Sequence, residues 1–171
     1  MSTTVITEAA PAGTEVKCEC KLGEAHGLIK KYTYWSLGAG ALPLGVLDLA
    51  AIAAVQTKLV NDLSNLYGVK FCQHRAKNIT AILIASVGAG TLLRGVTASV
   101  VKMIPLIGTF SGMVALPIVA GAATYALGKV FVQHFEMGGT LLDFDPEKTR
   151  EYFAAQFKEG QKVAADLKAA H

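Results

Sequence analysis

The side chains best suited to chemistry are three cysteines and a histidine in two short stretches. Cys18 and Cys20 lie near the N-terminus, and Cys72 and His74 lie near the middle of the chain. Thiolates and imidazoles are common zinc ligands. The usual zinc knuckle is Cys-x-x-Cys, however, whereas here the first stretch is Cys-x-Cys and the second is a single Cys-x-His. We therefore favour unligated thiols over a metal site, with cysteine acylation beside a membrane as an alternative.

A second candidate is an ion pair between Asp48 and Arg94. Arg94 lies deep in an apolar stretch, and an arginine near a bilayer centre normally has a partner or access to water. Asp48 is the best partner, and Lys102 competes for the same carboxylate. We expect a structural pair. A polar path through an oligomeric pore and an arginine that extends to the headgroups are the alternatives.

Motifs for catalysis or cofactor binding are not recognisable in the chain. Residues 121–129 superficially resemble a phosphate-binding loop, but the glycine spacing differs and Val130 stands where Ser or Thr is needed. The acids and histidines are too dispersed for a catalytic set. The net charge is only +3, without a basic block interleaved with aromatics. The sequence therefore predicts neither an enzyme, nor a cofactor, nor nucleic-acid binding.

A long uncharged run occupies residues 103–128. As a helix rising ~1.5 Å per residue it would reach about 39 Å, which exceeds the ~30 Å hydrocarbon core of a bilayer. A water-exposed helix of this length would carry a polar face. The run is therefore expected in a bilayer or at the centre of a helical bundle, and we favour the bilayer.

The hydrophobic pattern predicts an all-α protein without sustained strand alternation. We expect a disordered tail over 1–21 and one helical domain over 22–171. The domain would contain two apolar helical hairpins, at about 23–67 and 73–135, that associate with a membrane. A C-terminal amphipathic helix follows at about 146–168, because apolar residues recur there at three- and four-residue spacing.

Proline and glycine punctuate these elements. The hairpin tips contain Pro-x-Gly and Pro-x-x-Gly, and a Gly-Gly reversal follows the fourth helix. An Asp-Pro-Glu sequence gives the last helix a cap residue and a proline in its first turn. The predicted structural turn positions are Pro43, Gly45, Pro105, Gly108, Gly138, Gly139, Asp143 and Asp145.

The distribution of Lys and Arg predicts a topology. Basic residues gather near the termini and between the hairpins, so both termini are expected in the cytoplasm. The uncharged stretches 32–47 and 78–93 are shorter than the ~20 residues of a clean span, which leaves re-entrant insertion as an alternative. Glycine and alanine on several helices permit close approach, and a homo-oligomer is expected.

The most distinctive stretch is QHFEMGGTLLDFDP at residues 133–146. Together with the hairpins ALPLGVLDLAAIAAVQ and MIPLIGTFSGMVAL, it resembles the bacterial YcjF-type family, a GTPase-associated domain of unknown function often found behind Era-like GTPases. The resemblance covers about residues 25–157. It implies an α-helical, membrane-associated module that works with a GTPase, and it brings no catalytic residues. This chain has no GTP-binding motifs, so a GTPase partner would act in trans.

The resulting hypothesis is a non-enzymatic membrane protein that acts as an anchor, scaffold or remodelling accessory. Its expected partners are a lipid membrane, further copies of itself and a GTPase. Its expected location is a bacterial inner or internal membrane. The alternatives are an oligomeric pore and a soluble helical bundle that binds a lipid or another apolar ligand.

Overall fold

The computed structural model describes residues 12–39, 46–93 and 109–169, and the side chains of residues 21–39, 50–87 and 117–169. Over these residues the chain is all-α, as predicted, and contains no strand. The helices are α1 (Ala12–Ala39), α2 (Val46–Tyr67), α3 (Gln73–Leu93), α4 (Thr109–Glu136) and α5 (Pro146–Ala169).

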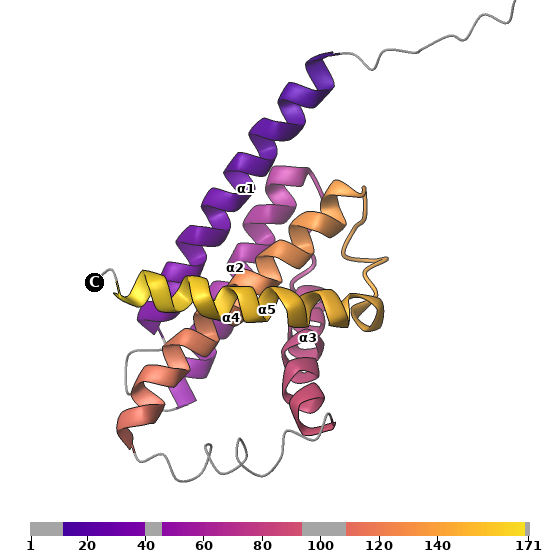
Figure 1. The fold of residues 1–171 in the computed structure, drawn as a ribbon. Helices are drawn as coiled ribbons and strands as arrows, with labels where there is room; N and C mark the ends of the chain where they lie inside the picture. The colour runs from indigo at the N-terminus through magenta and orange to yellow at the C-terminus, as the bar shows by residue number, and fades with distance from the viewer. Residues whose placement is uncertain (1–11, 40–45, 94–108, 170–171) are drawn as a thin grey trace, which may run out of the picture.

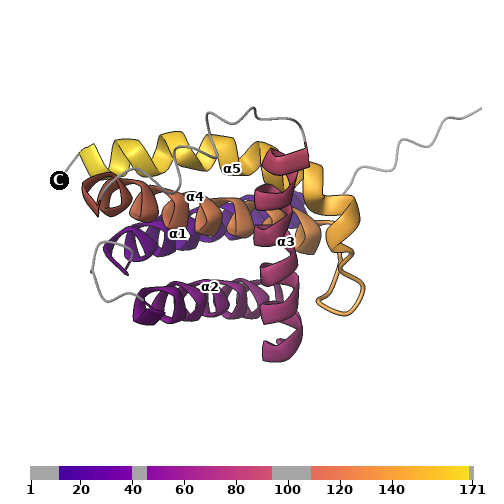
Figure 2. The same ribbon diagram turned by 90° about the horizontal axis from the view of Figure 1, so that it is seen from below.

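Three helices lie beside one another, with α1 running opposite to α2 and α4, and two helices cross them (Figure 1). Helices α1, α2 and α4 form this group, and α5 lies across α4 and α1 (Figure 1). Helix α3 runs across the direction of the other four (Figure 2). Helix α4 therefore has neighbours on several sides and forms the centre of the bundle.

The interior is built around the second half of α4. Leu127 and Phe131 are fully buried, and they belong to one apolar cluster with Ile29 of α1, Leu63 of α2 and Phe153 of α5. Burying such side chains contributes about 1.5–3 kcal/mol each. One core thus joins α4 to the helices on either side.

Close contact between α4 and α5 depends on a glycine. A Cβ added at Gly160 would lie 2.8 Å from the carbonyl oxygen of Ala122 and 3.1 Å from its Cα. A Cβ at Gly121 would lie 3.2 Å from the Cβ of Ala164. The small residues predicted to allow close helix approach therefore do so at this crossing.

The predicted second hairpin is wrong as a packed unit. Helix α3 has little contact with α4 and packs mainly on α5 and α2. The physical reason lies in α5, which occupies much of the surface of α4 that a hairpin partner would cover. Helices α1 and α2 do pack as an antiparallel pair, as predicted.

The predicted tail over residues 1–21 is too long. Helix α1 begins at Ala12, immediately after Pro11, rather than near residue 23. Residues 15–21 are rich in Glu and Lys, which favour helix, and they contain neither Gly nor Pro. The remaining predicted helix boundaries that fall on described residues agree with the observed ones within a few residues.

The expected transmembrane helices are not observed. Within the described parts of the chain, each helix is either too short or too polar to cross a bilayer. Most side chains of α4 from residue 120 to residue 128 are buried in the bundle. This part of the uncharged run therefore lies at the bundle centre, the alternative to the favoured bilayer.

Charge divides the four N-terminal helices into two ends. Residues 32–39, 46–57, 78–93 and 109–128 contain one charged residue, Asp48, and we call them the charge-poor end. Residues 58–77 and 129–146 contain the α2–α3 linker and the α4–α5 joint, and we call them the linker end. In Figure 1 the charge-poor parts of α2, α3 and α4 point downward and the linker end lies above.

Candidate functional site

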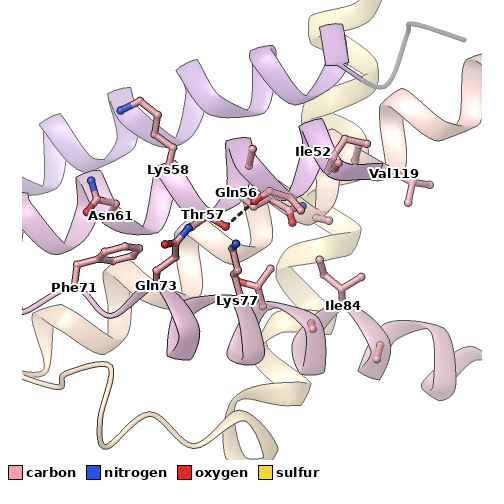
Figure 3. A pocket seen from close by; sticks show the side chains of 18 residues that line it. Ile52, Gln56, Thr57, Lys58, Asn61, Phe71, Gln73, Lys77, Ile84 and Val119 are labelled. Atoms are coloured by element: carbon pink, nitrogen blue, oxygen red, sulfur yellow. Dashed lines mark hydrogen bonds between the residues drawn. The ribbon is translucent and has the colours of Figure 1, made fainter. Parts of the chain in front are cut away.

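An open groove of about 1180 Å³ lies between α2, α3 and α4 (Figure 3). Small-molecule sites usually measure ~300–1,000 Å³, so the groove is large enough for a sizeable ligand. Its walls are mainly alanines and β-branched side chains. The alanines that line it are Ala50, Ala53, Ala54, Ala81, Ala85, Ala120 and Ala123.

The groove is polar at one end and apolar at the other. Asn61, Gln73 and Lys77 lie toward the linker end, while Ile84 and Val119 lie toward the charge-poor end (Figure 3). Ile84 is 38% exposed and Val119 is 45% exposed. Like the bundle that contains it, the groove is therefore polar toward the linker end and apolar toward the charge-poor end.

Lys77 is the charged group best placed to act in this groove. Its ammonium group points from α3 toward α2 (Figure 3), and the ion pairs found among the described residues do not include it. Lys58 also borders the groove, but its Nζ lies 3.6 Å from Asp62 Oδ1. Lys77 therefore offers a positive charge that no described carboxylate neutralises.

Buried polar groups lie beneath the apolar lining. The hydroxyl of Thr80 is buried, and it has no hydrogen-bond partner among the described residues. Gln56 Nε2 donates to Thr124 Oγ1 at 3.4 Å, and the Ser36 hydroxyl lies 2.7 Å from the same oxygen. An unpaired buried hydroxyl costs about 1–3 kcal/mol, which makes Thr80 an unusual element of the groove floor.

A second feature is an aromatic patch on the outer face of α1. Trp35 is 61% exposed and Tyr34 is 45% exposed, although large aromatic side chains are usually well buried. A shallow hollow of about 320 Å³ joins them to the C-terminal part of α5. It is lined by Gly27, Lys30, Lys31, Tyr34, Trp35 and Leu167.

The α4–α5 joint at the linker end is a capped turn. Gly138 has φ of +80°, and its N–H donates to the Phe135 carbonyl while the Gly139 N–H donates to the His134 carbonyl. These two bonds form a Schellman motif, which suits glycine at the left-handed position. The predicted Gly-Gly reversal is thus observed, and Gly68 ends α2 with the same bond pattern.

Asp143 and Asp145 complete the joint. Asp143 accepts hydrogen bonds from the hydroxyl and the N–H of Thr140, and these bonds lower the pKa of its carboxyl. Asp145 accepts a bond from the Glu147 N–H at 3.0 Å, which caps α5 as the sequence indicated. Arg75 donates to the Leu142 carbonyl at 2.9 Å and ties the start of α3 to the joint.

The predicted metal ligands are only partly described. Cys72 and His74 are exposed at the start of α3, and the side chains of Cys18 and Cys20 lie outside the described residues. No group of three His, Cys, Asp or Glu side chains suited to a metal ion occurs in the parts of the chain whose side chains are described.

Several other predicted positions fall outside the described part of the chain. The Asp48–Arg94 pair stays a prediction because the side chain of Asp48 and the whole of Arg94 are not described. The tip residues Pro43, Gly45, Pro105 and Gly108 are not described either.

Sequence reasoning missed the groove and its residues. Lys77 directly precedes the uncharged stretch 78–93, but Thr80 and Val119 have no distinguishing signal in the sequence. Lys77 and Thr80 lie on α3, and Val119 of α4 joins them in the groove only through the tertiary fold. The available clue is that an uncharged stretch begins after Lys77 on α3 and another ends before Lys58 on α2.

Comparison with known proteins supports the resemblance. The chain is 38% identical over 148 residues to magnetosome membrane protein 22 of Magnetospirillum gryphiswaldense, and the match covers 85% of this chain and 74% of that protein. No solved structure matches the chain. The family model of a domain of unknown function, DUF697, matches residues 19–162. The chain therefore belongs to the DUF697 family, the GTPase-associated family that its hairpins and joint resemble.

Proposed function

We propose that this chain is a non-enzymatic, membrane-associated helical protein that acts as an anchor or scaffold. Its charge-poor end faces the lipid and its linker end faces the aqueous phase. The name of the magnetosome relative supports the membrane association, since that protein is called a membrane protein. Homo-oligomers and a GTPase acting in trans are the proposed partners.

The observation that carries this proposal is the place of the exposed large apolar side chains. Seven such residues are exposed among the described ones, and five of them belong to the charge-poor end. These five are Tyr34, Trp35, Ile82, Ile84 and Val119. Exposed apolar side chains in a region with few charges are typical of an interaction surface, and a bilayer accepts such a surface without polar partners.

The aromatic patch indicates how deeply the bundle would enter the membrane. Trp and Tyr prefer the level of the lipid headgroups, and lysines beside them extend toward water. Tyr34 and Trp35 lie one turn beyond Lys30 and Lys31 on α1, toward the charge-poor end. Helix α5 crosses the bundle at this level (Figure 1), with Leu167 beside the patch. An amphipathic helix in this position suits the membrane surface.

The proposed location is a bacterial inner or internal membrane with the linker end on the cytoplasmic side. The linker end contains five Lys and Arg residues whereas the charge-poor end contains none, and cytoplasmic segments are enriched in these residues. We retain re-entrant or shallow insertion of the charge-poor end as the mode of association, because the described helices do not meet the requirements of a span.

Flotation with vesicles tests the proposal. The chain is mixed with vesicles of phosphatidylcholine and phosphatidylglycerol in equal parts and is expected to float with them. Ile82→Glu, at the charge-poor end, is expected to weaken binding about tenfold, because burial of an isoleucine contributes about 1.5–3 kcal/mol. Leu142→Glu is the matched control, since Leu142 is 70% exposed at the linker end. A chain that stays at the bottom of the gradient, or equal losses in both variants, would contradict the proposal.

A further inference from the structure

We infer that the groove between α2, α3 and α4 binds one anionic phospholipid of the surrounding leaflet. The acyl chains lie against Ile52, Ile84 and Val119, and the phosphate lies beside Lys77. This inference rests on the proposed function, because it assumes that the charge-poor end faces lipid. It adds a defined site and a lipid class to that function.

The polarity of the groove supports this occupant. A phospholipid has an apolar body and one charged end, and the groove has apolar walls and one cationic end. The apolar end of the groove lies toward the charge-poor end, which is the proposed membrane side, and its cationic end lies toward the linker end. A lipid in the groove would therefore stand in the same orientation as its neighbours in the leaflet.

The charge of Lys77 selects an anionic headgroup. Lys77 is exposed and has no ion-pair partner among the described residues, so a phosphate can reach its Nζ without displacing a carboxylate. Asn61 and Gln73 border the same end and can donate amide hydrogen bonds to phosphate oxygens. A phosphatidylcholine headgroup carries its own cation beside the phosphate, which reduces the attraction to Lys77.

The floor of the groove provides an independent observation. Thr80 lines the groove at only 8% exposure, and its hydroxyl has no partner among the described residues. Buried hydroxyls are normally satisfied, and the exceptions are often found where a ligand or water binds. An ester oxygen of a bound lipid could accept this hydrogen bond after a small rotation of the side chain.

The volume and exposure of the groove also fit a lipid better than a small polar ligand. About 1180 Å³ exceeds what most metabolites fill, and most of the lining atoms are apolar. Ile84 and Val119 would leave water when an acyl chain covered them. Removal of apolar surface from water is the main source of binding free energy for such a chain.

Native mass spectrometry of the full chain tests the inference directly. The protein in detergent is mixed with phosphatidylglycerol and phosphatidylcholine in equal parts, and the mass of the complex identifies the occupant. We expect one phosphatidylglycerol on each chain. A bound fatty acid, a second copy of the chain in place of lipid, or no preference for phosphatidylglycerol would overturn the inference.

Two variants locate the lipid. Ala85→Phe fills the groove and is expected to abolish the lipid complex, whereas Ala51→Phe adds the same ring to an exposed position of α2 outside the lining. Lys77→Gln is expected to reduce the preference for phosphatidylglycerol about fivefold, the effect of one lysine near an anionic surface. Lys70→Gln, outside the groove, is its control, and Lys77→Arg should retain the preference.

Flotation of the same variants separates this inference from the proposed function. If all variants float but Ala85→Phe still carries lipid as Ala51→Phe does, the groove assignment is wrong and the membrane proposal stands. If the unaltered chain does not float, the membrane proposal itself fails. Circular dichroism of Ala85→Phe verifies that the bundle has folded, and Lys77→Gln tests the site without added bulk.

Discussion

The two ends of this bundle are stabilised by different interactions. At the linker end, capped turns and hydrogen bonds hold the helices, as in the Schellman motif at Gly138 and the bond from Arg75 to Leu142. At the charge-poor end, close packing of small residues holds α4 against α5, and large apolar side chains remain exposed. The comparison indicates that capped turns and surface hydrogen bonds stabilise the end in water, whereas small-residue packing and buried hydrogen bonds around Thr124 stabilise the end assigned to lipid.

The largest predicted effect comes from breaking the close packing. Gly160→Leu would place a side chain where even a Cβ lies 2.8 Å from the Ala122 carbonyl oxygen. The backbones of α4 and α5 must then separate, and we expect the free energy of unfolding to fall by about 3 kcal/mol. Chemical denaturation in detergent measures this value.

The control for this variant is a glycine without neighbours. A Cβ at Gly27 on α1 would contact nothing within 4 Å. Gly27→Ala is therefore expected to raise the free energy of unfolding by about 0.5–1 kcal/mol, the usual gain for alanine in a helix. Similar losses of unfolding free energy in Gly27→Ala and Gly160→Leu would contradict the role assigned to close packing between α4 and α5.

A smaller effect is expected from the cap at the linker end. Gly138 has φ of +80°, and an L-residue in the left-handed region costs roughly 1–2 kcal/mol. Gly138→Ala should therefore lower the free energy of unfolding by about 1 kcal/mol. Gly138→Asn should lose less, since asparagine tolerates this conformation. Equal losses of unfolding free energy in the two variants would show that the left-handed conformation at Gly138 is not the cause.

The smallest predicted effect is a dependence on pH at the same joint. Hydrogen bonds from Thr140 hold the pKa of Asp143 below its ordinary value of 3.8. A lowered pKa contributes stability above the ordinary value, and this contribution is lost as the pH falls through the lowered one. Asp143→Asn should therefore show a weaker loss of stability in acid than the unaltered chain. If Asp143→Asn and the unaltered chain lose the same amount of stability as the pH falls, this account is contradicted.

Local sequence signals predicted the linker end well. Gly68, Gly138 and Asp145 end or begin helices as their residue types indicate, because a left-handed turn or an N-cap depends on a few neighbouring atoms. The start of α1 is harder to predict, because Pro11 and Gly13 disfavour a helix interior whereas the Glu and Lys residues that follow them favour one.

Long-range packing was much harder to predict. The uncharged run of α4 fits a bilayer and a bundle centre equally well, since periodicity cannot distinguish lipid from protein neighbours. The crossing of α3 over the bundle depends on α5, which lies far along the chain. For the same reason Lys77, Thr80 and Val119 were not grouped into one site until the fold was known.

The central claim is that the charge-poor end lies in lipid and the linker end does not. Trp35 is the only tryptophan of the chain, so its fluorescence reports on the charge-poor end alone. Vesicles with acyl chains brominated close to the headgroups should quench Trp35 strongly, because the aromatic patch is placed at the headgroup level. A chain with Trp35→Phe and Leu142→Trp, which moves the fluorophore to the linker end, should stay unquenched. Equal quenching of both proteins, or no quenching of Trp35 in vesicle-bound protein, would contradict the account.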